Sequence, residues 1–501
     1  MLVIDGSPLS LEVLELVAQG KEQVSLCPDS LERMSASRRH VDAILTEGRV
    51  VYGVNTGFGK LSDITIPDHQ VKILQTNLVR SHACGVGEPL TVAQARAMLL
   101  LRANVLAKGF SGARPVVAET LVNMLNGGVT PVIPSRGSVG ASGDLAPLAH
   151  LALVVIGEGE AFLDGVRLSG AKAMALAKIN PIELQAKEGL ALLNGTQAIC
   201  AVGGLALAKG YRLAGWATAA GAVTLEALLG TPAAFDPRIH AARNHSCQQQ
   251  VAAQLLALLQ DSQIRESHRE GDSRVQDAYS LRCMPQVHGA TLSALEYAKN
   301  AIESETGSAT DNPLVFENGD VISGGNFHGA PVALPLDFAA IALTDMASIA
   351  ERRIDRLVNP DSSEGLPAFL TNHPGTGSGF MIAHVTAAAL LNECKVLSHP
   401  ASVDSVPTSA GKEDHVSMGM TAALKLNQVV ENFGHLVAIE LMAACEGLEY
   451  RRPLSAGKGV ERVYRFVRSL VAKLEEDRAL GKDIETLAKA LGENEVNAQT
   501  E

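Results

Sequence analysis

The sequence is poor in aromatic residues and in positive charge. Phenylalanine, tyrosine and tryptophan make up 4% of the 501 residues, and there is a single tryptophan. Lysine and arginine number 42 against 54 aspartates and glutamates, so the formal net charge is −12 at pH 7. No cluster of basic residues alternates with aromatic ones. We therefore expect no nucleic acid partner, because binding its phosphates needs a basic surface.

Closely spaced cysteines are also missing. The seven cysteines are scattered and none forms a Cys-x-x-Cys pair, which argues against a disulfide framework or a zinc ribbon. No histidine spacing suggests a metal site, so we expect no metal. The N-terminus has early acidic residues and no basic region before an apolar run, so no signal peptide is visible. These absences favour a cytoplasmic enzyme.

One segment is long and apolar enough to be mistaken for a membrane span. Residues 189–208 run without a charge and meet the length criterion for crossing a bilayer. The segment nevertheless contains Asn194 and Gln197, and Glu188 and Lys209 border it closely. We interpret it as a buried helix of a large protein and expect no membrane association.

Apolar residues recur at helical spacing over long stretches. Two stripes with alternating steps of three and four residues predict long, closely packed helices. The first stripe is Leu336, Ala340, Leu343, Ala347, Ala350, Ile354 and Leu357, and the second is Leu426, Val430, Phe433, Val437, Leu441 and Ala444.

Strand signals are few. The segments around Asp164-Gly165 and Asn318-Gly319 predict short hairpins with two-residue turns that need positive φ. The chain therefore indicates a mainly α protein, with a mixed N-terminal domain at 1–200 and a helical bundle domain at 201–501.

Small residues are concentrated in the segment GSVGASGDLAPLAH, residues 137–150. The backbone nitrogen of Gly143 is suited to attack the Ala141 carbonyl, because glycine lacks the Cβ that would block so tight a bend. Loss of one water from the ring, and of the Ser142 hydroxyl as a second water, would leave an imidazolone with an exocyclic methylene. Taken alone, however, an Ala-Ser-Gly tripeptide is common by chance and is more often a flexible loop.

The surrounding motifs favour the reactive tripeptide over a flexible loop. Together with residues 137–150, they resemble the aromatic amino acid ammonia-lyases and aminomutases over most of residues 50–420. The segments that carry the resemblance are VYGVNTGFG, NLVRSHACGVGEPL, LLRANVLAKGFSGARP, KEGLALLNGTQA, QDAYSLRCMPQVHG, GNFHG and LSHPASVDSVPTSAGKEDHVSMG.

The resemblance implies a long-helix bundle with a superhelical core like that of aspartases and fumarases. It also implies a homotetramer with shared active sites and a methylidene-imidazolone (MIO) made from Ala141, Ser142 and Gly143, with no external cofactor. Ser81-His82 and Glu413-Asp414-His415 are most similar to the histidine branch. That branch converts L-histidine to trans-urocanate and ammonia, the first step of histidine degradation.

Roles for single residues follow from the same resemblance. Tyr52 matches the catalytic base, and a phenol would need positive surroundings to act near neutral pH. Arg282 matches the group that holds the substrate carboxylate, and His82 and Glu413 match those that hold the imidazole ring. The residues that match groups around the prosthetic ring are Asn194, Gln276, Tyr279 and Phe327.

Two alternatives remain open from the sequence. One is a tyrosine or phenylalanine ammonia-lyase or aminomutase with the same chemistry, and the other is a catalytically inactive helical scaffold. Two positions also depart from the family pattern. Lys412 stands where relatives commonly have an uncharged polar residue, and His384 stands where they usually have glutamine, which leaves details of substrate fit open.

Overall fold

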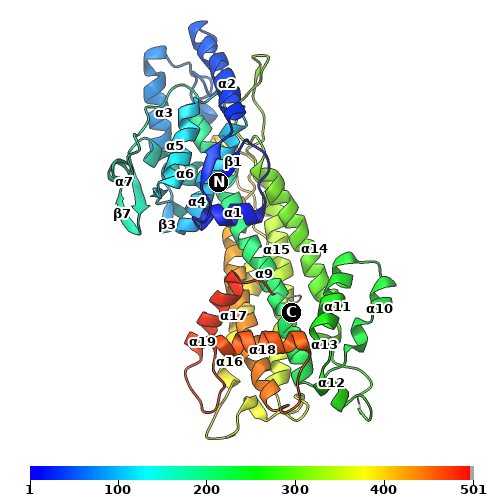
Figure 1. Ribbon diagram of the computed structural model, residues 1–501. Coiled ribbons are helices and arrows are strands. Elements are labelled where there is room, and N and C mark those ends of the chain that lie inside the picture. The colour runs from blue at the N-terminus through cyan, green and yellow to red at the C-terminus, as the bar shows by residue number, and fades with distance from the viewer. Residues whose placement is uncertain (273, 497–501) are drawn as a thin grey trace. The chain divides into compact units, whose positions relative to one another are not determined.

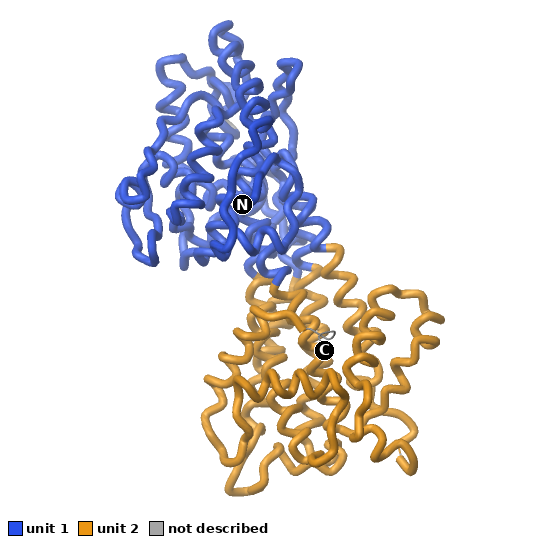
Figure 2. The backbone as a smooth tube through the Cα atoms, viewed as in Figure 1, with its two compact units in different colours: residues 1–208, 298–337, 400–424 blue, residues 209–297, 338–399, 425–501 orange. Residues whose placement is uncertain are grey.

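The computed structural model describes residues 1–272 and 274–496, which form two compact units (Figure 2). Unit 1 contains residues 1–208, 298–337 and 400–424, and unit 2 contains the remaining described chain. The first passage from unit 1 to unit 2 follows Ala208, near the boundary expected at residue 200. Two later segments return to unit 1, and a division into 1–200 and 201–501 does not describe that return.

Four long helices have residues in both units, and they account for much of the helical content (Figure 1). The prediction of a mainly α protein is confirmed. These helices are α9 (Gln197–Ala227), α14 (Met284–Thr306), α15 (Ala330–Val358) and α17 (Gly419–Glu449).

Unit 1 contains shorter helices and all nine small strands of the described chain. Its helices are α1 (Leu11–Ala18), α2 (Pro28–Thr46), α3 (Asp68–His82), α4 (Val92–Ala107), α5 (Pro115–Asn126), α6 (Leu145–Val155), α7 (Gly170–Leu176) and α8 (Glu188–Leu193), with 3-10 turns η1 (Gly59–Leu61) and η4 (Ser409–Gly411). Its strands are β1 (Leu2–Ile4), β2 (Val24–Leu26), β3 (Val86–Pro89), β4 (Thr130–Pro131), β5 (Pro134–Arg136), β6 (Glu160–Leu163), β7 (Val166–Ser169), β8 (Leu314–Val315) and β9 (Val321–Ile322).

The strands form small separate sheets. β1 pairs in parallel with β2, and the other pairs are antiparallel: β3 with β5, β4 with β6, β6 with β7, and β8 with β9.

Every regular element in the described part of unit 2 is a helix. Its remaining elements are η2 (Pro232–Phe235), α10 (Pro237–Ala241), α11 (Ser246–Leu258), α12 (Gln263–Ser267), α13 (Tyr279–Arg282), η3 (Ala368–Leu370), α16 (Met381–Leu397), α18 (Lys458–Leu470) and α19 (Gly481–Glu493).

Both apolar stripes lie on long helices and are buried. Every residue of the first stripe lies on α15 and every residue of the second on α17, and all have 0% exposure. In the part of the chain that is described, α15 is the one helix long and apolar enough to cross a membrane, but most of its apolar window is buried inside the protein. Its composition therefore reflects the core of the protein.

The two predicted hairpins differ in their turns. β6 and β7 are joined by Asp164 and Gly165, which have φ of 50° and 77°, as a two-residue turn requires. The turn between β8 and β9 is longer, because Gly319 N donates to Phe316 O and Phe316 N donates to Asp320 O. The prediction of a two-residue turn at Asn318-Gly319 is therefore wrong, although Gly319 has the positive φ of 85°.

Three helices of unit 1 form the frame on which the site is built. Helices α3, α6 and α8 pack against one another in all three pairs. His82 is the last residue of α3, Ser142 comes just before α6, and Asn194 follows the end of α8. The mutual packing of these helices therefore brings together three segments that are far apart in the sequence.

Candidate active site

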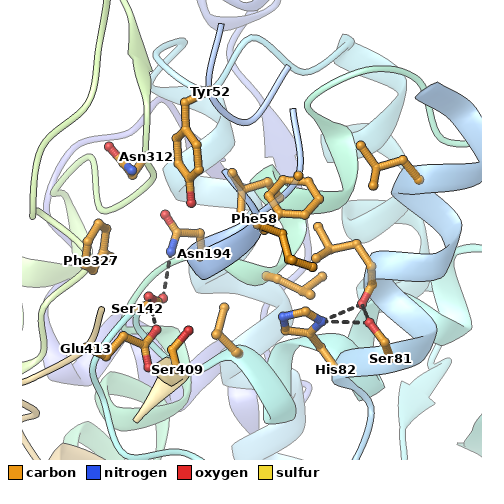
Figure 3. A pocket seen from close by; sticks show the side chains of 18 of the residues that line it. Tyr52, Phe58, Ser81, His82, Ser142, Asn194, Asn312, Phe327, Ser409 and Glu413 are labelled. Atoms are coloured by element: carbon orange, nitrogen blue, oxygen red, sulfur yellow. Dashed lines mark hydrogen bonds between the residues drawn. The ribbon is translucent and has the colours of Figure 1, made fainter. Parts of the chain in front are cut away.

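A cavity of about 650 Å³ lies in unit 1 (Figure 3). Its volume is in the range of sites that bind small molecules. A second cavity of about 290 Å³ has Ala141 and Gly143 in its lining and shares Ser142, His82 and Glu413 with the first. The larger cavity collects six of the predicted site residues: Tyr52, His82, Ser142, Asn194, Phe327 and Glu413.

The Ala-Ser-Gly loop packs against the non-helical residues 194–196, which separate α8 from α9. Gly143 and Gly195 form an isolated parallel bridge, and Asp144 N donates to Gly195 O at 2.7 Å. Their φ values are 76° and 142°, which side chains disfavour. A Cβ on Gly143 would also overlap the Gly195 backbone. Both positions therefore require glycine, for conformation and for space.

The break between α8 and α9 corrects one sequence interpretation. Residues 189–208 are buried as predicted, apart from partly exposed Leu205, but they do not form one helix. Helix α8 ends at Leu193 and α9 begins at Gln197. The interruption lets Asn194 turn its side chain into the cavity, where it is seen in Figure 3.

Arg102 supports this break, although sequence reasoning did not single it out. Its guanidinium donates to Ala191 O at 2.7 Å, to Asn194 O at 2.9 Å and to the Gln197 side chain. These bonds satisfy carbonyl groups at the end of α8, which lack helical partners. Arg102 is fully buried, and burial lowers its pKa to about 10. The signal in the sequence was an arginine inside the apolar run LLLRANVLA.

Asp144 anchors the other end of the loop. Its buried carboxylate accepts hydrogen bonds from Ile199 N at 2.8 Å and from Ser138 Oγ at 2.7 Å. Ile199 lies in the first turn of α9, where the helix dipole favours a negative charge. Burial still raises the pKa of Asp144 to about 6.

Ser142 is held from two sides (Figure 3). Its hydroxyl donates to Glu413 Oε1 at 2.6 Å, and its carbonyl oxygen accepts from Asn194 Nδ2 at 2.7 Å. The second oxygen of Glu413 accepts from Thr408 Oγ1 at 2.6 Å. Asn194 Oδ1 is buried without a partner among the described atoms, so an acceptor is left for a ligand.

His82 presents an acceptor to the cavity. Its Nδ1 lies 2.8 Å from Leu78 O, and because a carbonyl can only accept, Nδ1 carries the proton. The other ring nitrogen, Nε2, points into the cavity (Figure 3). Burial lowers the pKa of His82, which favours the neutral ring near pH 7.

Tyr52 lies in the same cavity, but its surroundings do not favour the phenolate. Burial raises the pKa of Tyr52, and the nearby negative charge of Glu413 raises it further. No lysine or arginine is found among the described side chains that line the cavity. The positive surroundings that a phenolate base needs therefore have to come from outside this lining.

The other three predicted residues belong to unit 2. Tyr279 and Arg282 are the ends of α13, and the Arg282 guanidinium lies over the Tyr279 ring, 4.6 Å from its centroid. Tyr279 is 70% exposed, and Arg282 Nε is buried without a partner in the described chain. Gln276 is exposed and lines a much smaller pocket.

The two departures from the family pattern also lie outside the cavity lining. His384 belongs to unit 2, where its Nε2 lies 2.8 Å from Glu351 Oε1. Lys412 is exposed beside Glu413.

Comparison with known proteins identifies the family. The model of the family described as "Aromatic amino acid lyase" matches residues 9–469. The chain belongs to the aromatic amino acid lyase family. It is 53% identical to a histidine ammonia-lyase of Myxococcus xanthus, over 99% of this chain and 98% of that one.

Solved structures show the same fold in more than one branch of this family. The chain resembles histidine ammonia-lyase of Trypanosoma cruzi with a TM-score of 0.91 and 44% identity, covering 98% of this chain and 93% of that one. It resembles tyrosine aminomutase of Streptomyces globisporus with a TM-score of 0.94 and 37% identity, covering 98% and 97%. The predicted family and its helical fold are confirmed, but backbone similarity does not distinguish the substrates.

Substitution of Gly143 tests the close backbone approach. We expect Gly143→Ala to lower the thermal unfolding temperature strongly, because its Cβ would overlap Gly195 in addition to being strained at positive φ. Gly165→Ala is the matched control, since its φ of 77° is nearly the same and no atom lies within 4 Å of its Cβ. The control should lose only about 1–2 kcal/mol. Equal losses of unfolding free energy in Gly143→Ala and Gly165→Ala would contradict the close approach of Gly143 to Gly195.

The partly buried ring of His82 predicts a pH dependence of stability. Because its folded pKa lies below the ordinary 6.5, the unfolded chain binds a proton first as the pH falls. Its contribution is fully present above pH 6.5 and is lost as the pH drops toward the folded pKa. The free energy of unfolding, measured with urea, should fall less steeply with decreasing pH for His82→Gln than for His69→Gln. The second variant removes an exposed histidine of the same helix. Identical pH profiles would contradict the burial of His82.

Proposed function

We propose that the protein is a histidine ammonia-lyase, which eliminates ammonia from L-histidine to give trans-urocanate. The observation that carries this proposal is the cavity in which Ser142 of the Ala-Ser-Gly loop lies beside His82 and Glu413. The reaction would be the first step of histidine degradation. All seven cysteines are free, which is consistent with the reducing cytoplasm as its location.

The loop fits the MIO group that the family resemblance implies. Gly143 has no Cβ and a positive φ, and it lies where any side chain would overlap Gly195. Asn194 Nδ2 already donates to the carbonyl oxygen of Ser142, where a ring oxygen would be stabilised by the same donor. When formed, the group supplies an electrophile for the amine of the substrate.

The polar residues of the cavity favour histidine as the substrate. Neutral His82 offers an acceptor at Nε2, and Glu413 offers a carboxyl group, so the two can meet the two nitrogens of an imidazole ring. A phenyl ring would leave His82 Nε2 and, once the Ser142 hydroxyl has gone, Glu413 Oε1 without partners, which costs about 1–3 kcal/mol for each. The higher identity to histidine ammonia-lyases than to the tyrosine aminomutase supports the same choice.

The substrate carboxylate and the catalytic base need positive groups, and the described cavity lining contains no lysine or arginine. Tyr52 is proposed as the base, and its raised pKa calls for a nearby cation that the described cavity lining lacks. Arg282 would hold the carboxylate, while Gln276 and Tyr279 would complete the surroundings of the ring. We propose that these three come from neighbouring chains of a homotetramer, as the family resemblance implies.

Product formation provides the direct test. Purified protein supplied with L-histidine should produce urocanate, detected by its ultraviolet absorbance. Ser142→Ala should lower kcat at least about a thousandfold, a barrier increase of about 4 kcal/mol, because the electrophile cannot form. Ser135→Ala, on nearby β5, serves as the control and should stay active.

The same assay separates the alternatives. A preference for tyrosine or phenylalanine over histidine would favour the other branches of the family. Absence of product from any of the three, with Ser142→Ala behaving like the unaltered protein, would favour an inactive scaffold.

Subunit mixing tests the shared site. Tyr52→Phe and Arg282→Leu, each inactive alone, should regain about a quarter of the activity after dissociation, mixing and reassembly. Random assembly leaves both residues intact in about one site in four when the two come from different subunits. Each variant reassembled by itself is the control. No recovery in verified mixed oligomers would place both residues in the same chain's site.

A further inference from the structure

The carboxylate of Glu413 is fully engaged before any cyclisation of the loop. One oxygen accepts from Ser142 Oγ and the other from Thr408 Oγ1, both at 2.6 Å. The Ser142 hydroxyl is the group that must leave if the MIO forms. In this structure, Glu413 therefore contacts the leaving group of the maturation reaction.

We propose that Glu413 is the general acid that protonates the Ser142 hydroxyl as it leaves during maturation, and that Thr408 is its positioning residue. This inference rests on the proposed function, because it presupposes that the Ala-Ser-Gly loop cyclises. It adds a second role to a residue otherwise assigned to the substrate ring.

The surroundings of Ser142 single out Glu413. Among the described side chains, Glu413 is the one titratable group hydrogen-bonded to Ser142. Tyr52 and His82 line the same cavity, but among the described side chains neither is hydrogen-bonded to Ser142. Asn194 holds the Ser142 carbonyl and cannot act as an acid. A separation of 2.6 Å allows a proton carried by Oε1 to pass to Oγ without rearrangement.

The proposed step balances without an oxidant or reductant. After Gly143 N has joined the Ala141 carbonyl carbon and the first water has left, the Ser142 Cα–H proton passes to a solvent water. The electrons of that bond form the new Cα–Cβ double bond. Glu413, whose two oxygens accept hydrogen bonds in the structure, first takes up a proton from the solvent. The Cβ–Oγ bond then breaks, its electron pair stays on Oγ, and Oγ takes this proton and leaves as the second water. Glu413 is left as the carboxylate.

Thr408 fixes the orientation of the Glu413 carboxyl group. Its hydroxyl donates to Oε2, and the backbones of Thr408 and Glu413 form an antiparallel bridge. This leaves Oε1 directed at Ser142. Once Oγ has left, Oε1 has lost that donor, while Oε2 is still held by Thr408. The carboxyl group is then free to meet a ligand in the cavity.

The mass of newly made protein tests this role without relying on activity. Protein purified after short expression is followed by intact mass spectrometry until the loss of two water molecules is complete. We expect Glu413→Gln to lose the second water at least about 100-fold more slowly, the usual contribution of a general acid. The Glu413→Gln protein should therefore accumulate in forms that have lost one water molecule or none. Asp414→Asn, the neighbouring exposed acid, is the control and should mature at the normal rate.

A second variant keeps the test decisive if Glu413→Gln does not fold, as judged by circular dichroism. Thr408→Val retains the carboxylate but removes its donor, and should slow maturation about 2- to 10-fold. Glu413→Asp should mature faster than Glu413→Gln, because it retains an acid. Complete loss of two waters at the normal rate in folded Glu413→Gln, or in Thr408→Val if Glu413→Gln is unfolded, would overturn the inference.

The failure of this inference can be told apart from failure of the proposed function. If the unaltered protein never loses two waters, the proposed function fails. If Glu413→Gln matures at the normal rate and has merely lost lyase activity, the proposed function stands and the maturation role of Glu413 is wrong.

Discussion

The contact between the backbones of Gly143 and Gly195 is the constraint on which the site depends. It joins the loop before α6 to the break between α8 and α9, with Asp144 N donating to Gly195 O. Neither glycine could carry a side chain there, since each has a positive φ and close neighbours. The contact brings Ser142 and Asn194 within hydrogen-bonding distance, although they are 52 positions apart in the chain.

Buried charged side chains hold the backbone segments on either side of this contact. Arg102 binds carbonyl oxygens at the end of α8, and Asp144 binds the first turn of α9. Lys187, immediately before α8, donates to Asp311 at 2.9 Å, with both side chains buried. Removing one partner from a buried ion pair typically destabilises a protein by about 3–5 kcal/mol. The paired arrangement therefore keeps an irregular stretch of backbone at a fixed position inside an apolar core.

The features that could be predicted from the sequence are those that depend on local patterns of residues. The stripes on α15 and α17 were readable because a helix returns the same face every three or four residues. The candidate residues Tyr52, His82 and Glu413 followed from short motifs. The break at Asn194 was missed because the run around it carries no charge and is mostly apolar, as in an uninterrupted buried helix. The return of 298–337 and 400–424 to unit 1 depends on tertiary contacts that no periodicity encodes.

Arg102 and Thr408 show the same limit at the level of single residues. Both lie in segments that resemble the family, but their roles depend on partners distant in the chain or in the fold. Arg102 is 92 positions from Asn194, whose carbonyl it holds. Thr408 matters because it occupies one oxygen of Glu413, whose other oxygen faces Ser142. Such relations become visible only when the side chains are placed in space.

The central claim is that Ala141, Ser142 and Gly143 react with one another in the mature protein. The most direct measurement is the mass of the proteolytic peptide that contains these three residues, taken from the active, unaltered protein. The account predicts a peptide lighter than its sequence by two water molecules, with the loss confined to these residues. A peptide of unmodified mass from fully active protein would contradict it.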